Sequence, residues 1–176
     1  MQALAIIALS ILAAVSYGIV HDQITARVCV EYFTIGHPQV LAVQTNSPTV
    51  LGFVWGVIAT WWVGLGLGIP LAAAARFGSR PRKSARDLIR PLFVLMMVAG
   101  MLALCAGLVG YVAASRDWVA LHGPLSRQVP QQLHARFIAD LFAHNMSYAV
   151  GGIGGIVLII HVWRSRRLSS NRPAAQ

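Results

Sequence analysis

Length, composition and charge exclude a water-soluble domain. The chain has 176 residues, of which 57% are hydrophobic and 11% are charged, and its formal net charge is +9. Soluble domains carry about 25% charged residues, so this chain has too few to keep a globular surface in water. The composition therefore indicates an integral membrane protein.

Four apolar runs supply the predicted elements in chain order, at residues 3–20, 50–75, 91–115 and 146–163. At about 1.5 Å per residue, the shortest run reaches roughly 27 Å as a helix, close to the roughly 30 Å hydrocarbon core of a bilayer. None of the runs alternates polar and apolar residues as a membrane β-strand does. We therefore predict an all-α fold, a single integral membrane bundle of four transmembrane helices.

The first run admits two interpretations, a retained helix or a secretory signal peptide. It ends in small residues that resemble a cleavage site, but no Lys or Arg precedes it as a signal peptide requires. We expect a retained helix. Cleavage would leave three helices and place the new N-terminus beside the polar segment that follows.

Basic residues predict the orientation of the bundle. Lys and Arg are concentrated in the loop at residues 76–90 and in the tail at 164–176, and they are sparse in the loops at 21–49 and 116–145. By the positive-inside rule, both termini are expected to be cytoplasmic and the two sparse loops to lie outside. The excess of arginine over lysine, together with abundant alanine, indicates a GC-rich bacterial genome and hence a bacterial inner membrane.

The same charge distribution bears on partners. A basic cytoplasmic face next to anionic headgroups is typical of topological anchoring in the lipid bilayer. Nucleic acid is not expected as a partner, because no basic surface with interleaved aromatic residues is present to stack bases.

Glycine pairs four residues apart recur in the second and fourth runs. Such small-xxx-small pairs let helix backbones approach closely in lipid, where no hydrophobic effect drives association. Pro70 follows one of these pairs and removes a backbone hydrogen bond, so a kink is expected there. The pairs are Gly52 and Gly56, Gly64 and Gly68, and Gly151 and Gly155.

Two polar segments adjoin the first and last runs, at residues 21–38 and 134–148. If each segment continues its neighbouring helix, a turn of 100° per residue places its polar side chains on one face. Ionisable side chains at a bilayer boundary must face the protein interior, a partner or a water-filled cavity. The two faces comprise His21, Asp22, Thr25, Cys29 and Tyr32 on the first helix and Arg136, Asp140, His144 and Ser147 on the last.

These faces predict a metal site. Imidazole, carboxylate and thiolate are the ligand types of a transition metal such as zinc, iron or copper. If the first and last helices adjoin, three or four ligands could come together from His21, Asp22, Cys29, Asp140 and His144. His21 and His144 could alternatively bind haem as axial ligands. The chain contains no HExxH, CxxC or Glu-x-x-His motif, so no reaction is identified and enzymatic activity stays open.

A structural interpretation accounts for the same residues. His21 and Asp22 would bond to helix ends, and Cys29 would be a small buried hydrophobe. His144 and Asp140 would form an interhelical network with Arg136. The polar faces would then contact a membrane-protein partner or a second copy in a homo-oligomer, and the protein would be a structural or assembly subunit. A channel or transporter is less favoured, because the predicted membrane centre lacks ionisable residues.

The first polar segment also carries a resemblance. Residues 21–38, with the sequence HDQITARVCVEYFTIGHP, resemble a segment of uncharacterised bacterial multi-pass membrane proteins. The resemblance covers about a tenth of the chain and implies no activity.

Overall fold

The structure, a computed structural model, describes residues 1–38 and 44–170, with side chains described as far as Arg166. Within these residues the chain forms helices and turns and no strand. Four described stretches are long and apolar enough to cross a membrane, and the prediction of an all-α bundle with four such helices is therefore confirmed. They are Gln2–Val28, Pro48–Arg76, Arg86–Ser115 and Gln131–Arg166.

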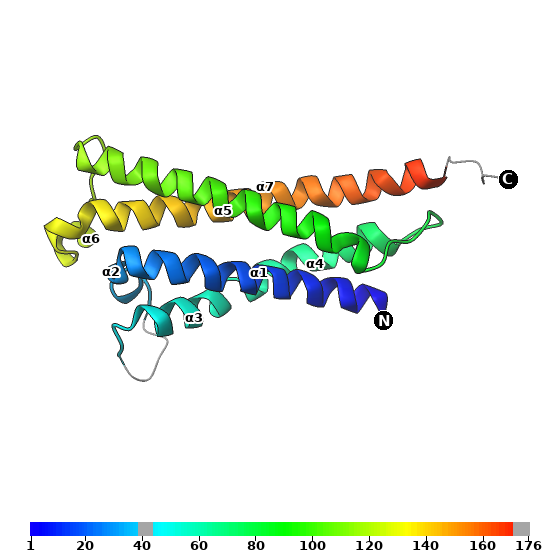
Figure 1. Cartoon of the computed structure of the whole chain (residues 1–176), viewed down its shortest axis with the longest axis horizontal. Coiled ribbons are helices and arrows are strands. Elements are labelled where there is room, and N and C mark those ends of the chain that lie inside the picture. The colour runs from blue at the N-terminus through cyan, green and yellow to red at the C-terminus, as the bar shows by residue number, and fades with distance from the viewer. Residues whose placement is uncertain (39–43, 171–176) are drawn as a thin grey trace.

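Seven α-helices and one short 3-10 turn make up the described fold. The long helices form the bundle, and the short ones lie in the connections at one end of it (Figure 1). The elements are α1 (Gln2–Val28), α2 (Val30–Thr34), α3 (Pro48–Ile58), α4 (Trp61–Arg76), α5 (Arg86–Ser115), α6 (Pro124–Gln128), η1 (Gln131–Leu133) and α7 (His134–Ser170).

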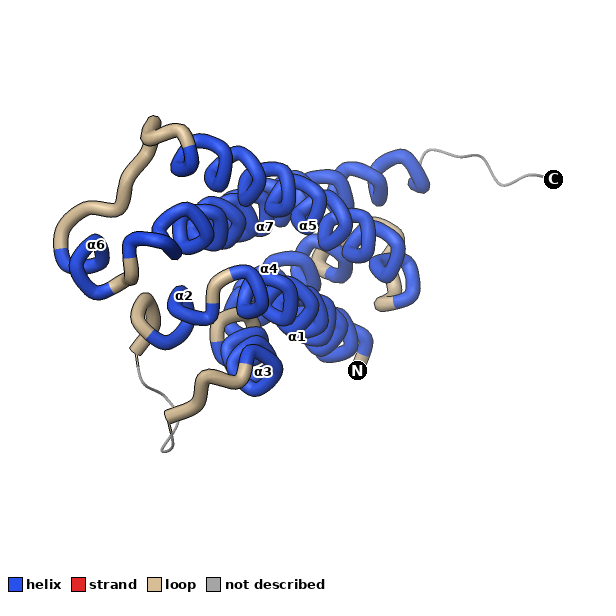
Figure 2. The backbone as a smooth tube through the Cα atoms, turned by 60° about the vertical axis from the view of Figure 1, so that its left-hand side comes forward, coloured by secondary structure: helices blue, strands red, loops and turns tan. Residues whose placement is uncertain are grey.

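The bundle consists of two halves that face each other. In the first half α1 packs along α3 and α4, and in the second half α5 packs along α7. Contacts from α1 to α5 and from α4 to α7 join the two halves. Figure 2 shows this division, with α1, α3 and α4 on one side and α5 and α7 on the other. The N-terminus, the α4–α5 loop and the far end of α7 lie at one end of the bundle, and α2 and α6 lie at the other (Figure 1).

Glycines explain the close packing of α1 against α3 and α4. A Cβ atom added to Gly56 would lie 2.5 Å from Ile19 Cα, and one added to Gly64 would lie 2.6 Å from Ile11 Cα. Both distances are too short for any side chain, so the backbones of α1, α3 and α4 touch only because glycine occupies these positions. This confirms the expected close approach for the glycine pairs of the second span.

The glycine pair of the fourth span behaves differently. No atom lies within 4 Å of a Cβ added to Gly151, and one added to Gly155 meets only the flexible end of Leu67, at 3.1 Å. No backbone approaches either glycine, so the expectation of close packing there is wrong. The sequence spacing is the same in both spans, but in the fourth span α4 meets the buried Gly155 through the side chain of Leu67 rather than through its backbone.

The second span is interrupted between α3 and α4, before Pro70 is reached. α4 continues through Pro70 to Arg76, whereas α3 ends at Ile58 and α4 begins at Trp61. The hydroxyl of Thr60 donates to the carbonyl of Gly56, while the Thr60 amide bonds one residue later, to Val57. A side-chain donor that takes the i−4 carbonyl weakens the regular helical bond, so the break falls at residues 59–60.

The loops predicted at residues 21–49 and 116–145 are partly helical in the structure. α1 continues to Val28, and α7 begins at His134 rather than at 146. The extensions form because each carries a face that packs inside the bundle, with Ala26 and Phe137 at 1% exposure. Cys29 follows the last residue of α1, and its φ of −150° is that of extended backbone.

Packing is concentrated at the two ends of the bundle. One cluster is aliphatic and includes Ile6, Leu71 and Leu92, while the other is aromatic and includes Phe33 and Trp55. The aliphatic end is closed by Arg166, which is 1% exposed and whose guanidinium donates to four carbonyls. These carbonyls belong to the last turn of α4 and the loop after it, so the contact caps α4 and ties it to α7. The acceptors are Ala74, Phe77, Arg80 and Pro81.

Candidate functional site

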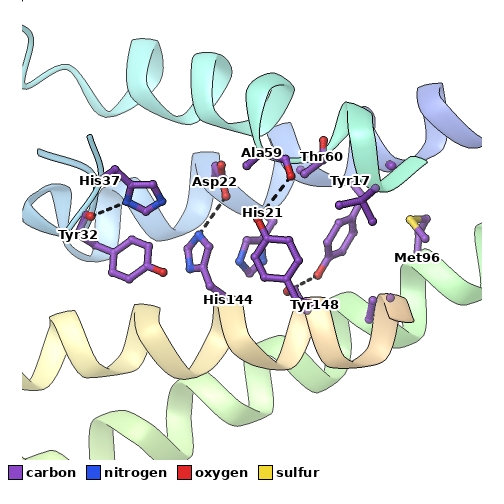
Figure 3. A pocket seen from close by; sticks show the side chains of 16 residues that line it. Tyr17, His21, Asp22, Tyr32, His37, Ala59, Thr60, Met96, His144 and Tyr148 are labelled. Atoms are coloured by element: carbon purple, nitrogen blue, oxygen red, sulfur yellow. Dashed lines mark hydrogen bonds and ion pairs between the residues drawn. The ribbon is translucent and has the colours of Figure 1, made fainter. Parts of the chain in front are cut away.

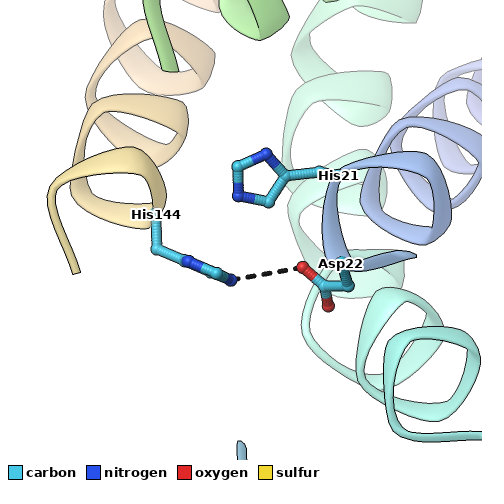
Figure 4. A group of neighbouring side chains, drawn as sticks. All are labelled: His21, Asp22 and His144. Atoms are coloured by element: carbon cyan, nitrogen blue, oxygen red, sulfur yellow. Dashed lines mark hydrogen bonds and ion pairs between the residues drawn. The ribbon is translucent and has the colours of Figure 1, made fainter. Parts of the chain in front are cut away.

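Three side chains converge where α1 meets α7, beside the aromatic cluster. His21 and Asp22 come from consecutive positions on α1, and His144 comes from α7 (Figure 4). One potential ligand atom from each residue lies within 4.8 Å of the other two. The structure thus brings together three of the five predicted ligands.

His144 is held in a fixed orientation. Its Nδ1 donates to the carbonyl of Asp140 at 2.8 Å, and its Nε2 lies 3.2 Å from Asp22 Oδ1. A proton fixed on Nδ1 leaves Nε2 of the neutral ring with a lone pair, and histidines that bind metals usually donate their other N–H in this way. Two ligands on a tetrahedral zinc ion are roughly 3.3 Å apart when each bond is about 2.0 Å. The spacing of His144 and Asp22 therefore suits two ligands of one ion.

His21 supplies the third donor and is not satisfied by the protein. Its Nε2 is buried and has no hydrogen-bond partner among the residues described. Its ring stacks on Tyr17 at a centroid distance of 5.7 Å and meets His144 edge to face at 4.6 Å. A buried nitrogen without a partner costs about 1–3 kcal/mol, and a bound cation or ligand would recover that free energy.

Aromatic side chains shield the site on the side of α2. Tyr32 stacks on His144 with 4.4 Å between ring centroids, and both residues lie beside the site in Figure 3. The ring of His37 lies 4.5 Å from that of Trp55. His37 Nδ1 donates to the carbonyl of Tyr32 at 2.9 Å. Burial raises the pKa of the Tyr32 hydroxyl and lowers the pKa of His37, so both groups favour their neutral forms.

A cavity of about 90 Å³ adjoins the three donors. Roughly 30 Å³ corresponds to one water molecule, so the cavity holds a few waters or a small polar ligand. Tyr17 Oη and Ser147 Oγ share a hydrogen bond of 2.7 Å in its wall, and Tyr148 Oη donates to the Ala59 carbonyl at 3.5 Å. The break between α3 and α4 is what places Ala59 and Thr60 beside this space (Figure 3).

Cys29 lies apart from the three donors. It is 2% exposed within the aromatic cluster, and its Sγ donates to Glu31 Oε2 at 3.5 Å. Burial raises the pKa of the thiol to about 12, so the group stays protonated rather than forming the thiolate that binds metals. Cys29 therefore fits the buried-hydrophobe interpretation.

Asp140 is also outside the group of three. It is 1% exposed and reaches the site only through its backbone carbonyl, which accepts from His144. Its Oδ2 has no hydrogen-bond partner in the described part of the chain. The expected network with Arg136 does not form, because that side chain is exposed on the outside of α7.

Haem does not fit the geometry. Axial histidines bind the iron from opposite faces of the porphyrin. The rings of His21 and His144 instead contact each other directly, at 4.6 Å between centroids, with Asp22 hydrogen-bonded beside them. No room is left for a porphyrin plane between the two rings.

Several residues of the cavity wall were not predicted from the sequence. Tyr148 follows Ser147 on α7 and could have been placed by extending the polar face by one position. No sequence pattern predicts that His37 lies in the cavity wall, because this residue reaches the site through a turn after α2.

Comparison of the chain with protein-family models, curated proteins and solved structures finds no match. The interpretation of the site therefore depends on its own residues.

Proposed function

We propose that this chain is a multi-pass membrane protein that binds one transition metal ion through His21, Asp22 and His144. The observation that supports the proposal is the convergence of their ligand atoms within 4.8 Å. Two of the donors come from α1 and the third comes from α7, so folding of the bundle assembles the site.

The electrostatics of the site favour a cation. Asp22 is 5% exposed and lies within a membrane-spanning helix, where an isolated carboxylate is costly. A divalent ion between the carboxylate and the two imidazoles would compensate that charge and would also satisfy His21 Nε2.

The donor set narrows the choice of metal. Two imidazoles and one carboxylate are typical of zinc sites with an exchangeable water and of non-haem iron(II) sites. Both kinds of site keep a coordination position open. The adjoining cavity, with the hydroxyls of Tyr17 and Tyr148 in its wall, gives that position room for water or a small polar ligand. Zinc and iron(II) are thus favoured, and copper is the third candidate.

We further propose that both termini and the α4–α5 loop are cytoplasmic, with the metal site near the outer face of a bacterial inner membrane. Support comes from the basic residues gathered at the end of the bundle that holds the N-terminus, as the positive-inside rule requires.

A structural or assembly subunit is the second candidate. The direct contact of His144 with Asp22 favours it, because this pair joins α1 to α7 without an ion. In that case the exposed helix faces would bind a membrane-protein partner or another copy of the chain, which would co-purify with it.

Elemental analysis distinguishes the two candidates. The chain would be purified in detergent through an affinity tag free of histidine, and its metal content would be measured for wild type, Asp22→Asn, His144→Ala and His122→Ala. His122 is exposed and outside the site, so it provides a matched histidine control. We expect about one metal ion per chain in the wild type and the control and a loss in both site variants. Folded wild-type protein that neither carries metal nor takes up added zinc, iron(II) or copper would refute the metal site.

A further inference from the structure

A second cavity, of about 280 Å³, lies between α1, α5 and α7. It shares Tyr17 and His21 with the smaller cavity, but neither Asp22 nor His144 belongs to its lining. The larger cavity is therefore a separate space that meets the candidate metal site at the ring of His21.

The larger cavity opens to the side of the bundle. Its lining includes Val20, Ile24, Leu104 and Leu108, each of which is more than half exposed. In a helix that spans a membrane, exposed aliphatic side chains of this kind face the acyl chains. A molecule dissolved in the bilayer could therefore enter without crossing water.

Small residues leave the space open. The α5 wall presents Gly100, Ala103 and Gly107, and the α7 wall presents Ala139 and Ala143. A Cβ atom added to Gly100 would meet only Tyr17 Cε2, at 3.6 Å, which is ordinary van der Waals contact. The cavity thus suits an apolar body, as small-molecule sites generally do.

A carboxyl oxygen in the lining is left without a partner. Asp140 is 1% exposed, and its Oδ2 accepts no hydrogen bond within the described residues. His21 Nε2, at the junction with the smaller cavity, is the other buried polar atom of the lining without a partner among the described residues, whereas Tyr17 bonds to Ser147 and Thr25 donates to the His21 carbonyl. A buried carboxyl oxygen without a donor is unfavourable, and inside a membrane such a residue usually marks a functional site.

We propose that this cavity binds a lipid-soluble molecule whose apolar body fills the space between α1 and α5 and whose hydroxyl group donates to Asp140 Oδ2. Isoprenoid alcohols and quinols share this chemistry. The inference goes beyond the metal site and does not require a bound metal, because only His21 of the three proposed ligands lines this cavity and the hydroxyl acceptor, Asp140, is not one of them.

Ligand-induced stabilisation tests the proposal. Thermal unfolding of the full chain in detergent would be followed with EDTA present, so that no metal contributes. The probes are farnesol, compared with its methyl ether, and duroquinol, compared with its dimethyl ether. Each ether keeps the apolar body and lacks a hydroxyl donor. The variants are Asp140→Leu, which removes the acceptor, and Gly100→Leu, which fills the cavity. Gly152→Leu is the matched control, because no atom lies within 4 Å of its Cβ position.

We expect at least one hydroxyl probe to raise the unfolding midpoint of the wild type and of Gly152→Leu by about 5 °C at about 100 times Kd. The ethers should have little effect, and Asp140→Leu should lose the shift. Gly100→Leu should also lose it, and if that variant does not fold, Asp140→Leu alone decides. A response to farnesol only identifies an alcohol site, and a response to duroquinol only identifies a quinol site. Equal shifts with the ethers, or no shift with either hydroxyl probe, would overturn the proposal.

Discussion

His144 Nε2 lies 3.2 Å from Asp22 Oδ1, and this contact joins α7 to α1 across 122 positions of the sequence. Their side chains are 10% and 7% exposed, so neither is compensated by solvent. Removing one partner of such a buried pair leaves the other unpaired, which costs more than the pair itself contributes. The same contact therefore positions two donors of the candidate metal site and couples the two halves of the bundle.

The first prediction concerns this coupling in metal-free protein. Asp22→Ala and His144→Ala should each lower the free energy of unfolding by about 3 kcal/mol, because each leaves a buried polar partner unpaired. The double variant should lose about 1–3 kcal/mol less free energy of unfolding than the sum of the two single losses. The measurement is unfolding in mixed micelles with increasing SDS.

His161→Ala is the control for this cycle, because His161 is exposed on the same helix and should change stability little. Additivity of the two site variants within about 0.5 kcal/mol would show that the contact carries no coupling.

The second prediction concerns the contact of α1 with α3. Gly56→Ala should destabilise the protein by about 2 kcal/mol, since the new methyl group would lie 2.5 Å from Ile19 Cα and must push the backbones apart. Gly66→Ala is the matched control, because no atom lies within 4 Å of its Cβ position. It should be neutral or stabilising by up to about 1 kcal/mol, through helix propensity alone. Equal effects of the two variants on the unfolding midpoint would contradict the close backbone approach.

Much of this arrangement could be predicted from the sequence, because helix geometry controls it. The apolar lengths set the number of spans, and the period of 100° per residue placed His21 and Asp22 on one face of the first helix and His144 on one face of the last. The structure brings these three together. Only the adjacency of the two helices had to be assumed.

The residues that could not be placed depend on axial register and on turns. Asp140 shares a helix face with His144 but lies one turn earlier, about 6 Å along the axis, and so falls at a different depth from Asp22. Cys29 follows the end of α1, where extended backbone removes it from the helical face. His37 returns over the site through a turn. Periodicity within a helix carries no information on any of these three features.

The third prediction concerns the reactivity of Cys29. A pKa of about 12 leaves roughly one thiol in ten thousand ionised at pH 8, so alkylation should be about a thousand times slower than at a cysteine with the ordinary pKa of 9.0. Burial within the aromatic cluster adds a steric barrier to the reagent. In a Cys105→Ser background, mass spectrometry should find little maleimide on the folded protein at pH 8 and complete labelling in SDS. Rapid labelling of folded protein would show an accessible thiolate instead.

The fourth prediction concerns pH and His37. Burial lowers its pKa below the ordinary 6.5, so below that pH the unfolded chain takes up a proton that the folded chain resists. Because the unfolded state then binds more protons, the free energy of unfolding should fall as the pH drops from 6.5 towards 5. His37→Gln removes the titrating group, so its stability should decline less steeply with acid than that of the wild type. His122→Gln, at an exposed position, should leave the slope unchanged. A slope in His37→Gln equal to that of the wild type would assign the acid sensitivity to other groups.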